Sequence, residues 1–323
     1  MKVISVVTPC FNEEENVEEL YLRVRNVMAR VDRYAYEHIF IDNHSGDATV
    51  AILKNLAKRD SNVRIIVNSR NFGHVRSPLH AFLQARGDAV IGLAADLQDP
   101  PELIEEMITR WEQGYAMVLC IKETSQENPL MFRLRTIYYR LVQRLSSLQT
   151  FENFTGFGLY NRQVVEHIRS FGDAYPYFRG MIAEIGLPYF KLVFDQPRRE
   201  RGITKNNLYT LYDFAMLGIT NLSKVPLRLV TFFGFVGSML CGIVGLGYLV
   251  YKLLFWNSFS VGTAPLVIGL FFLGSVQLVS MGILGEYIGA IHTQVLKRPY
   301  VIEQERVNFE FEPGPPFASN EPT

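Results

Sequence analysis

The chain has few cysteines and no excess of charge of either sign. Its 323 residues include three cysteines, and 32 basic side chains balance 32 acidic ones. Cys10, Cys120 and Cys241 are too far apart for a zinc-binding spacing, and their odd number excludes a complete disulfide framework. We expect buried free thiols in a reducing compartment. The balanced charge gives no indication of nucleic-acid binding.

The first 228 residues contain no long uncharged apolar run. The remaining residues contain two such runs. The early stretch Val3–Val7 is too short for a signal peptide and is soon followed by Pro9 and three glutamates, so it predicts a buried strand. The two later runs are Leu229–Tyr251 and a run that begins after Asn257 and ends at Leu284. Because a helix needs roughly 20 apolar residues to cross a bilayer, these runs predict two C-terminal transmembrane helices.

Basic residues flank the two runs on their outer sides, and Lys252 is the only basic residue between the runs. The loop between the runs, at about residues 254–264, contains no lysine or arginine. The positive-inside rule therefore places both chain termini in the cytoplasm. The flanking residues are Lys205, Lys224, Arg228, Lys297 and Arg298. We expect a globular domain at 1–205, an interfacial amphipathic helix at 206–228, a two-helix transmembrane anchor at 229–296 and a partly disordered cytoplasmic tail at 297–323.

The globular part alternates short apolar runs with amphipathic segments. This alternation predicts an α/β fold with a doubly wound, mostly parallel sheet, whose ligands bind at the carboxyl ends of the strands. Asn12 and Glu15 could form a capping box before the first helix. The predicted strands are Val3–Thr8, His38–Ile41, Val63–Val67, Ala89–Ala94, Met117–Ile121 and Tyr189–Phe194. The predicted helices begin near Val17 and cover Asp47–Lys58, His74–Ala85 and Pro101–Gln113.

A further predicted helix, Pro129–Leu148, has apolar residues along one side and arginines beside them. Two interpretations stay open. The helix could lie at a membrane surface as a basic amphipathic helix, or it could be an ordinary core-packing helix with a solvated charged face.

Polar residues follow several of the predicted strands. After the first strand, Phe11 could support a flat base, and Glu13 could accept hydrogen bonds from a ribose or base, although an ordinary turn explains this segment equally well. After the second, Asp42 suits a uracil or ribose edge, whereas Asp47 could simply cap a helix. After the third, Arg70 could approach a phosphate or brace the loop.

The segment Asp96-Leu97-Gln98-Asp99 follows the fourth strand. Carboxylate and amide oxygens at this spacing suit a hard cation such as Mg²⁺ or Mn²⁺, which would also bind diphosphate oxygens. The alternative is a polar loop without a metal. We take Asp96, Gln98 and Asp99 as the candidate metal ligands.

In their order, these segments resemble family 2 glycosyltransferases of the GT-A fold, which use nucleotide-sugar donors. Several motifs are similar to the polyprenyl-phosphate branch, and most of all to its bactoprenol (undecaprenyl-phosphate) glucosyltransferase type. They are Ser69-Arg70-Asn71-Phe72-Gly73, Ala95-Asp96-Leu97-Gln98-Asp99-Pro100-Pro101-Glu102, Arg199-Glu200-Arg201-Gly202-Ile203-Thr204-Lys205, Gly285-Glu286-Tyr287-Ile288-Gly289 and Lys297-Arg298-Pro299. One further motif resembles the nucleotide-binding opening of the family as a whole, Pro9-Cys10-Phe11-Asn12-Glu13.

The resemblance implies an inverting transfer of one sugar, expected to be glucose, from a UDP-sugar to undecaprenyl phosphate. It also implies a bacterial inner-membrane protein with two spans and a cytoplasmic catalytic domain. Asp96, Arg199 and Lys205 would be catalytic. The substrate-binding residues would be Pro9, Phe11, Glu13, Asp42, Arg70, Lys122 and Arg135.

The sequence departs from the family at one point and leaves alternatives open. Many relatives have a D-x-D motif where this chain has Ala94-Ala95-Asp96. A mannosyl- or aminosugar-polyprenyl-phosphate synthase remains an alternative, as does a membrane subunit that binds a nucleotide sugar or lipid without transfer. The residue pattern names neither the sugar nor the oligomeric state, and a homo-oligomer stays open.

Overall fold

The structure is a computed structural model that describes residues 1–123, 151, 153–197, 216, 225–255 and 263–309. The chain divides into two compact units. The described strands belong to one unit, and the helices α9 (Val225–Leu254) and α10 (Thr263–Val295) belong to the other. The predicted segments 129–148 and 206–215 lie outside the described residues, as do Arg135, Arg199 and Lys205.

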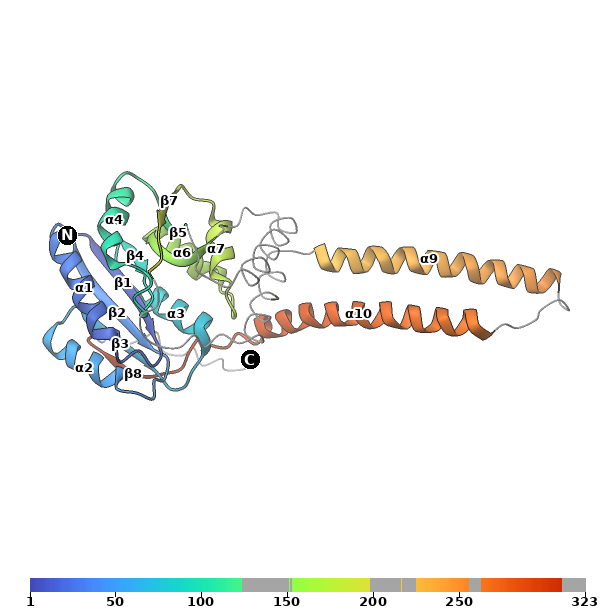
Figure 1. The fold of residues 1–323 in the computed structure, drawn as a ribbon, viewed down its shortest axis with the longest axis horizontal. Coiled ribbons are helices and arrows are strands. Elements are labelled where there is room, and N and C mark those ends of the chain that lie inside the picture. The colour runs from blue at the N-terminus through green and yellow to red at the C-terminus, as the bar shows by residue number, and fades with distance from the viewer. Residues whose placement is uncertain (124–150, 152, 198–215, 217–224, 256–262, 310–323) are drawn as a thin grey trace, which may run out of the picture. The chain divides into compact units, whose positions relative to one another are not determined.

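The first unit is built on a mixed sheet of eight strands (Figure 1). The strand order is β7-β5-β6-β4-β1-β2-β3-β8. β1 pairs in parallel with β2 and β4, β2 with β3, and β5 with β7, whereas β6 and β8 run antiparallel to their neighbours. The strands are β1 (Val3–Cys10), β2 (Ala35–Asp42), β3 (Val63–Asn68), β4 (Ala89–Gly92), β5 (Met117–Lys122), β6 (Phe154–Asn161), β7 (Tyr189–Phe194) and β8 (Glu303–Val307).

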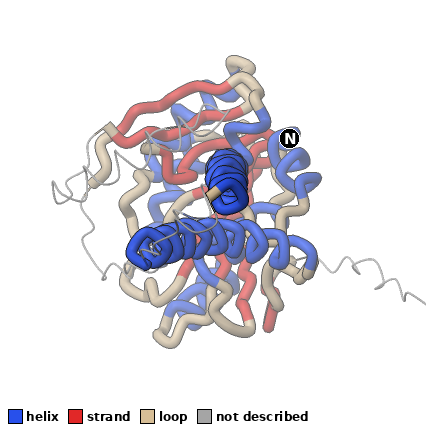
Figure 2. The backbone as a smooth tube through the Cα atoms, turned by 90° about the vertical axis from the view of Figure 1, so that its right-hand side faces the viewer, coloured by secondary structure: helices blue, strands red, loops and turns tan. Residues whose placement is uncertain are grey.

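Helices cover both faces of this sheet, as the doubly wound prediction requires (Figure 1, Figure 2). Along β1, Ile4 and Val6 belong to one buried cluster, while Val7 belongs to the other. The first cluster packs against α1 (Val17–Arg30), α2 (Thr49–Arg59) and α4 (Ile104–Glu112), which follows the short 3₁₀ helix η1 (Pro101–Leu103). The second packs against α3 (Gly73–Gln84), α6 (Arg162–Phe171) and α7 (Phe178–Ile185).

The predicted strands are confirmed in position, but two strands were not predicted. β6 carries Gly156 and Gly158 in the sequence FTGFGLYN, so its β pattern is interrupted. β8 has the sequence EQERV, which lacks the apolar pattern of the other strands. It is an edge strand that pairs antiparallel with β3, and charged residues are common on such strands. Part of the predicted tail at 297–323 is therefore an ordered strand of the sheet.

The predicted capping box at Asn12 and Glu15 is wrong. Helix α1 begins at Val17, and its N-cap residue Asn16 makes no side-chain cap hydrogen bond. The Asn12 side chain instead accepts a hydrogen bond from Gly46 N at 2.8 Å. The Asn12 side chain therefore contacts the neighbouring β2–α2 loop rather than its own helix.

The second unit contains two long apolar helices, of 30 residues in α9 and 33 in α10. Within the described residues, one segment, Phe272–Val295, is long and apolar enough to cross a membrane, and Val225–Leu240 is a shorter apolar stretch. Two membrane spans are thus not established, and the second stays a prediction.

Candidate active site

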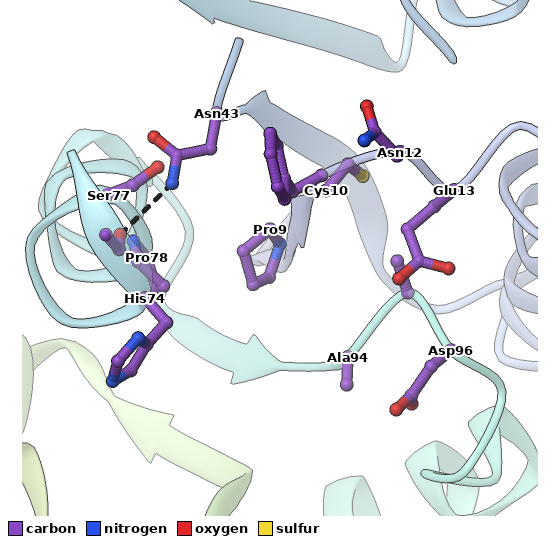
Figure 3. Close-up of a pocket in the computed structure, with 13 residues that line it drawn as sticks. Pro9, Cys10, Asn12, Glu13, Asn43, His74, Ser77, Pro78, Ala94 and Asp96 are labelled. Atoms are coloured by element: carbon purple, nitrogen blue, oxygen red, sulfur yellow. Dashed lines mark hydrogen bonds between the residues drawn. The ribbon is translucent and has the colours of Figure 1, made fainter. Parts of the chain in front are cut away.

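A pocket of about 320 Å³ opens at the carboxyl ends of β1 and β4 (Figure 3). Of the predicted site residues, Pro9, Phe11, Glu13 and Asp96 line it together. In Figure 3, Glu13 and Asp96 lie on one side of the pocket, and His74 and Ser77 lie on the other. The other lining residues are Cys10, Asn12, Asn43, Gly73, Pro78, Ala94 and Ala95. Segments from four parts of the chain therefore meet in one cavity.

Hydrogen bonds between two loops hold the β1 side of the pocket. Asn12 N donates to Ser45 Oγ at 2.8 Å, and Glu13 N donates to Thr49 Oγ1 at 2.9 Å. Asn12 has a φ of 54°, a left-handed conformation that asparagine tolerates better than most residues. These bonds orient the Glu13 backbone so that its side chain lines the pocket.

Asp42 lies behind this loop rather than at the pocket wall. Its side chain is buried and accepts hydrogen bonds from Ser45 N at 2.9 Å and from Ser45 Oγ at 2.5 Å. Because Ser45 Oγ also accepts the bond from Asn12 N, Asp42 positions the pocket loop indirectly. Its direct contact with a nucleotide stays a prediction.

Asp47 stabilises the first turn of α2, as the simpler interpretation of this residue expected. Its Oδ1 accepts hydrogen bonds from Thr49 N at 3.0 Å and Thr49 Oγ1 at 2.5 Å. Burial alone would raise the pKa of Asp47, but the bonds from Thr49 and Glu14 outweigh it and lower that pKa.

A buried amide network, which the sequence analysis missed, forms the α3 side of the pocket. Asn43 Nδ2 donates to Asn71 Oδ1 at 2.9 Å, and Asn43 Oδ1 accepts from Phe72 N at 2.9 Å. Asn68 Nδ2 links this group to Ser77 Oγ at 2.9 Å. The network holds the loop that brings Gly73, His74, Ser77 and Pro78 to the pocket. A run of asparagines at two adjacent strand ends was the available signal.

Two predicted phosphate-binding residues lie outside this pocket. Arg70 is exposed, with its guanidinium carbon 4.0 Å from the centre of the Phe72 ring, and it donates to Asn71 O at 3.0 Å. Lys122 ends β5, and its backbone N donates to Asn153 O at 3.3 Å. Neither lines the cavity, so their substrate contacts stay predictions.

The acidic motif forms a tight turn. Gln98 N donates to Asp96 Oδ1 at 3.2 Å, and Leu97 has a φ of 60°, which is unusual for leucine. Asp99 is buried and accepts from Ala94 N at 3.3 Å. Burial, and then the nearby charge of Asp96, raises the pKa of Asp99 to about 6.

Asp96 faces the pocket, whereas Asp99 is packed behind it. Within the described ranges, no group of three or more His, Cys, Asp or Glu side chains could hold a metal alone. Mg²⁺ usually binds one or two carboxylates together with substrate phosphates and water. The residues present therefore fit a cation shared with a bound diphosphate.

Cys10 lines the pocket, but its surroundings disfavour the reactive thiolate form. Its side chain is 2% exposed. Burial, and then the negative charges of Asp42, Glu13 and Asp47, raises the pKa of the Cys10 thiol well above its usual value. Because the thiolate is the reactive form of cysteine, this site does not favour a covalent cysteine intermediate.

Comparison with known proteins matches residues 5–169 to the family model described as Glycosyl transferase family 2. An uncharacterized glycosyltransferase of Synechocystis sp. is 32% identical over 311 residues, covering 96% of this chain and 97% of its own length. The SfII prophage-derived bactoprenol glucosyl transferase of Shigella flexneri is 35% identical over 303 residues, covering 93% and 97%. A prophage bactoprenol glucosyl transferase homolog of Escherichia coli is 34% identical over 303 residues, covering 93% and 98%.

Among solved structures, a complex of glucosyl-3-phosphoglycerate synthase from Mycobacterium tuberculosis with Mn²⁺ and UDP has a TM-score of 0.44. Its sequence identity is 18%, and the match covers 68% of this chain and 78% of that one. This similarity is too distant to inform the activity.

Proposed function

Because this chain belongs to glycosyl transferase family 2 and is a glycosyltransferase, we propose that it transfers one sugar, glucose, from a UDP-sugar to undecaprenyl phosphate. The observation that carries the proposal is the meeting of Pro9, Phe11, Glu13 and Asp96 in one pocket. The similarity to a bactoprenol glucosyl transferase and to a bactoprenol glucosyl transferase homolog supports the acceptor and the sugar.

The donor would bind in the pocket between the β1 loop and the start of α3. Phe11 and Glu13 line this pocket. Phe11 would offer a flat face for the uracil, and Glu13 would accept hydrogen bonds from the ribose hydroxyls. A volume of about 320 Å³ lies within the range of small-molecule pockets. Asp42 would support this arrangement through Ser45.

The reaction would be a single displacement with inversion. An oxygen of the acceptor phosphate attacks the anomeric carbon, a new bond forms between these two atoms, and the bond from that carbon to the UDP oxygen breaks. The acceptor phosphate is already ionised, so no protein base has to remove a proton. The residues of the chain would contribute by holding both substrates in line and stabilising the leaving diphosphate.

We expect Asp96, with Gln98 and Asp99, to hold Mg²⁺ or Mn²⁺ beside the diphosphate. Such a cation, when bound, offsets the charge that develops on the leaving group. Arg199 and Lys205 would bind the leaving diphosphate or the acceptor phosphate. Arg70, Lys122 and Arg135 are further candidates for phosphate contacts.

The acceptor implies a membrane location. The apolar segment Phe272–Val295 supports insertion into a bilayer. The lysines and arginines outside the two apolar runs favour a cytoplasmic catalytic domain at a bacterial inner membrane, held by two spans.

Incubation of the purified full-length chain with undecaprenyl phosphate and radiolabelled sugars tests this function. We expect label from UDP-glucose to enter the lipid fraction in the presence of Mg²⁺ or Mn²⁺. Transfer from another UDP-sugar or from a GDP-sugar instead would show an aminosugar or mannosyl enzyme. No transfer from any donor, together with measurable UDP binding, would show a binding subunit without activity and refute the proposal.

A further inference from the structure

Two arginines lie over the ring of Phe72, and a third arginine, from a distant part of the sequence, lies near one of them. The guanidinium carbons of Arg70 and Arg76 lie 4.0 and 5.6 Å from the centre of the Phe72 ring. Arg76 also donates to Pro299 O at 2.5 Å, which brings Arg298 beside it. Residues 70–76 and the segment after α10 therefore form one positively charged surface.

Within the part of the chain that the structure describes, no acidic side chain pairs with the arginines of this surface. Burial, and then the positive charges of Arg70 and Arg298, lowers the pKa of Arg76. Among the described residues, none of these three arginines forms an ion pair, and Arg76 Nε is buried without a hydrogen-bond partner. By contrast, Arg306 pairs with Glu303, and Arg169 pairs with Glu166 at 2.6 Å.

Such an arrangement costs free energy unless an anion is bound. Like charges at short range repel one another, and partial burial strengthens the repulsion. A guanidinium offers a planar pair of donors that matches two phosphate oxygens, and several of them around one site select for phosphate. The stacking on Phe72 and the bond to Pro299 O hold the two guanidinium groups of Arg70 and Arg76 in place beforehand.

This surface is separate from the donor pocket. None of the three arginines lines the pocket, although Gly73, His74 and Ser77 of α3 do. The two regions share α3, with Arg76 on the same first turns of the helix as Ser77. An anion on the arginines would therefore lie near the pocket without occupying it.

We propose that Arg70, Arg76 and Arg298 form a phosphate-binding site that takes the phosphate of a membrane lipid. Arg298 is the third residue after Val295, where the apolar helix α10 ends, so a chain inserted in a bilayer would hold it near the headgroups. The phosphate could come from the polyprenyl phosphate acceptor, a monoester, or from an anionic phospholipid, a diester. The choice of lipid source rests on the proposed function, whereas the site itself does not.

The test uses the full-length chain in dodecyl maltoside at low ionic strength, because salt screens exposed charges. The probes are farnesyl phosphate, phosphatidylglycerol in mixed micelles, inorganic phosphate and UDP. The readout is the rise in melting temperature with probe concentration, since ligands that bind the folded state stabilise it. The variants are Arg70→Gln and Arg298→Gln, with Arg59→Gln as a control of equal charge change on the exposed end of α2.

We expect each variant to weaken binding of at least one lipid phosphate by about tenfold or more. UDP binding should remain as in the wild type in Arg298→Gln and in the control. Without a probe, both variants should melt at or above the wild-type temperature, because one repulsive charge is removed. A preference for farnesyl phosphate over phosphatidylglycerol assigns the site to the acceptor, and the reverse assigns it to bilayer lipid.

Unchanged binding of all three phosphate probes in both variants would overturn the site. A loss of UDP binding alone in the variants would also overturn the site, because the arginines would then belong to the donor pocket. If sugar transfer is absent while arginine-dependent phosphate binding persists, the proposed function fails and the phosphate site stands.

Discussion

His80 on α3 and Glu303 on β8 are 223 positions apart, and His80 Nε2 lies 2.5 Å from Glu303 Oε1. Arg306 binds the same carboxylate. Next to this pair, Ser69 N donates to Ile302 O at 2.9 Å. The segment that follows α10 is thus bonded both to the end of β3 and to α3, the helix that supplies Gly73, His74 and Ser77 to the pocket.

Replacement of Glu303 should loosen this attachment in a pH-dependent manner. Burial would raise the pKa of Glu303, but the bonds from Arg306 and His80 outweigh it and lower the pKa to about 2. A lowered folded-state pKa adds stability above the unfolded pKa, and this stability disappears as the pH falls from about 5 towards 2. We expect Glu303→Gln to lose about 2 kcal/mol at pH 7 and the difference from wild type to shrink below pH 4–5.

Melting curves from pH 3 to pH 8 measure this effect. Glu305→Gln is the matched control on the same strand, because Glu305 pairs with Lys54 where both side chains are about 40% exposed. An exposed pair contributes about 0–1 kcal/mol. Equal loss in both variants at every pH would contradict the special role of Glu303.

Gly158 should not tolerate a side chain. A Cβ at this position of β6 would overlap the Val118 carbonyl oxygen on β5. Because backbone atoms cannot move aside without shifting the sheet, Gly158→Ala should destabilise the fold by about 1–3 kcal/mol. Gly46→Ala is the control, since a Cβ there meets nothing within 4 Å. Urea unfolding of both variants gives the comparison, and similar midpoints would refute the predicted overlap.

Asp96→Ala should abolish sugar transfer without unfolding the protein. Asp96 lines the pocket rather than the core, and loss of a metal-binding carboxylate should lower the rate by about a hundredfold or more. Turnover with added Mg²⁺ or Mn²⁺ and with EDTA is the measurement, and Asp32→Asn, at an exposed turn, is the control. Near-normal turnover of Asp96→Ala in excess EDTA would exclude a role in metal-dependent catalysis.

Arg199→Ala and Lys205→Ala should each slow transfer by about a hundredfold, because losing one phosphate contact removes roughly 3 kcal/mol of transition-state stabilisation. The alternative is that both residues only bind anionic headgroups, at about 1 kcal/mol each. Turnover in detergent with a short-chain acceptor separates the two, since no bilayer is present. Wild-type turnover of both variants there would leave only the anchoring role.

The distribution of lysine and arginine predicts that residues 258–263 face away from the cytoplasm and residues 308–323 face it. Single cysteines at Ser258 and Ser319, in a chain lacking the three native cysteines, can be labelled with an impermeant maleimide in intact bacterial cells. We expect label at Ser258→Cys only. Labelling confined to Ser319→Cys would reverse the topology.

Local patterns in the sequence were sufficient for much of the fold and part of the site. Apolar runs located β1 to β5 and β7. For β1 to β5 the reason is that a strand buried on both faces must be apolar whatever its neighbours are, whereas β7 is apolar but partly exposed. Pro9, Phe11, Glu13 and Asp96 could be predicted to meet because the carboxyl ends of parallel strands share one edge of a sheet. The order of the motifs was enough to indicate the family.

Contacts between distant segments could not be inferred in this way. β6 pairs with β4 and β5, and β8 pairs with β3. The local sequence of a glycine-containing or charged segment does not predict these pairing partners. The pleat sends successive side chains to opposite faces. Asp42 at the end of β2 and Asn43 directly after it are both buried, but only Asn43 lines the pocket. Which of the two neighbours reaches the pocket depends on how the whole sheet is assembled.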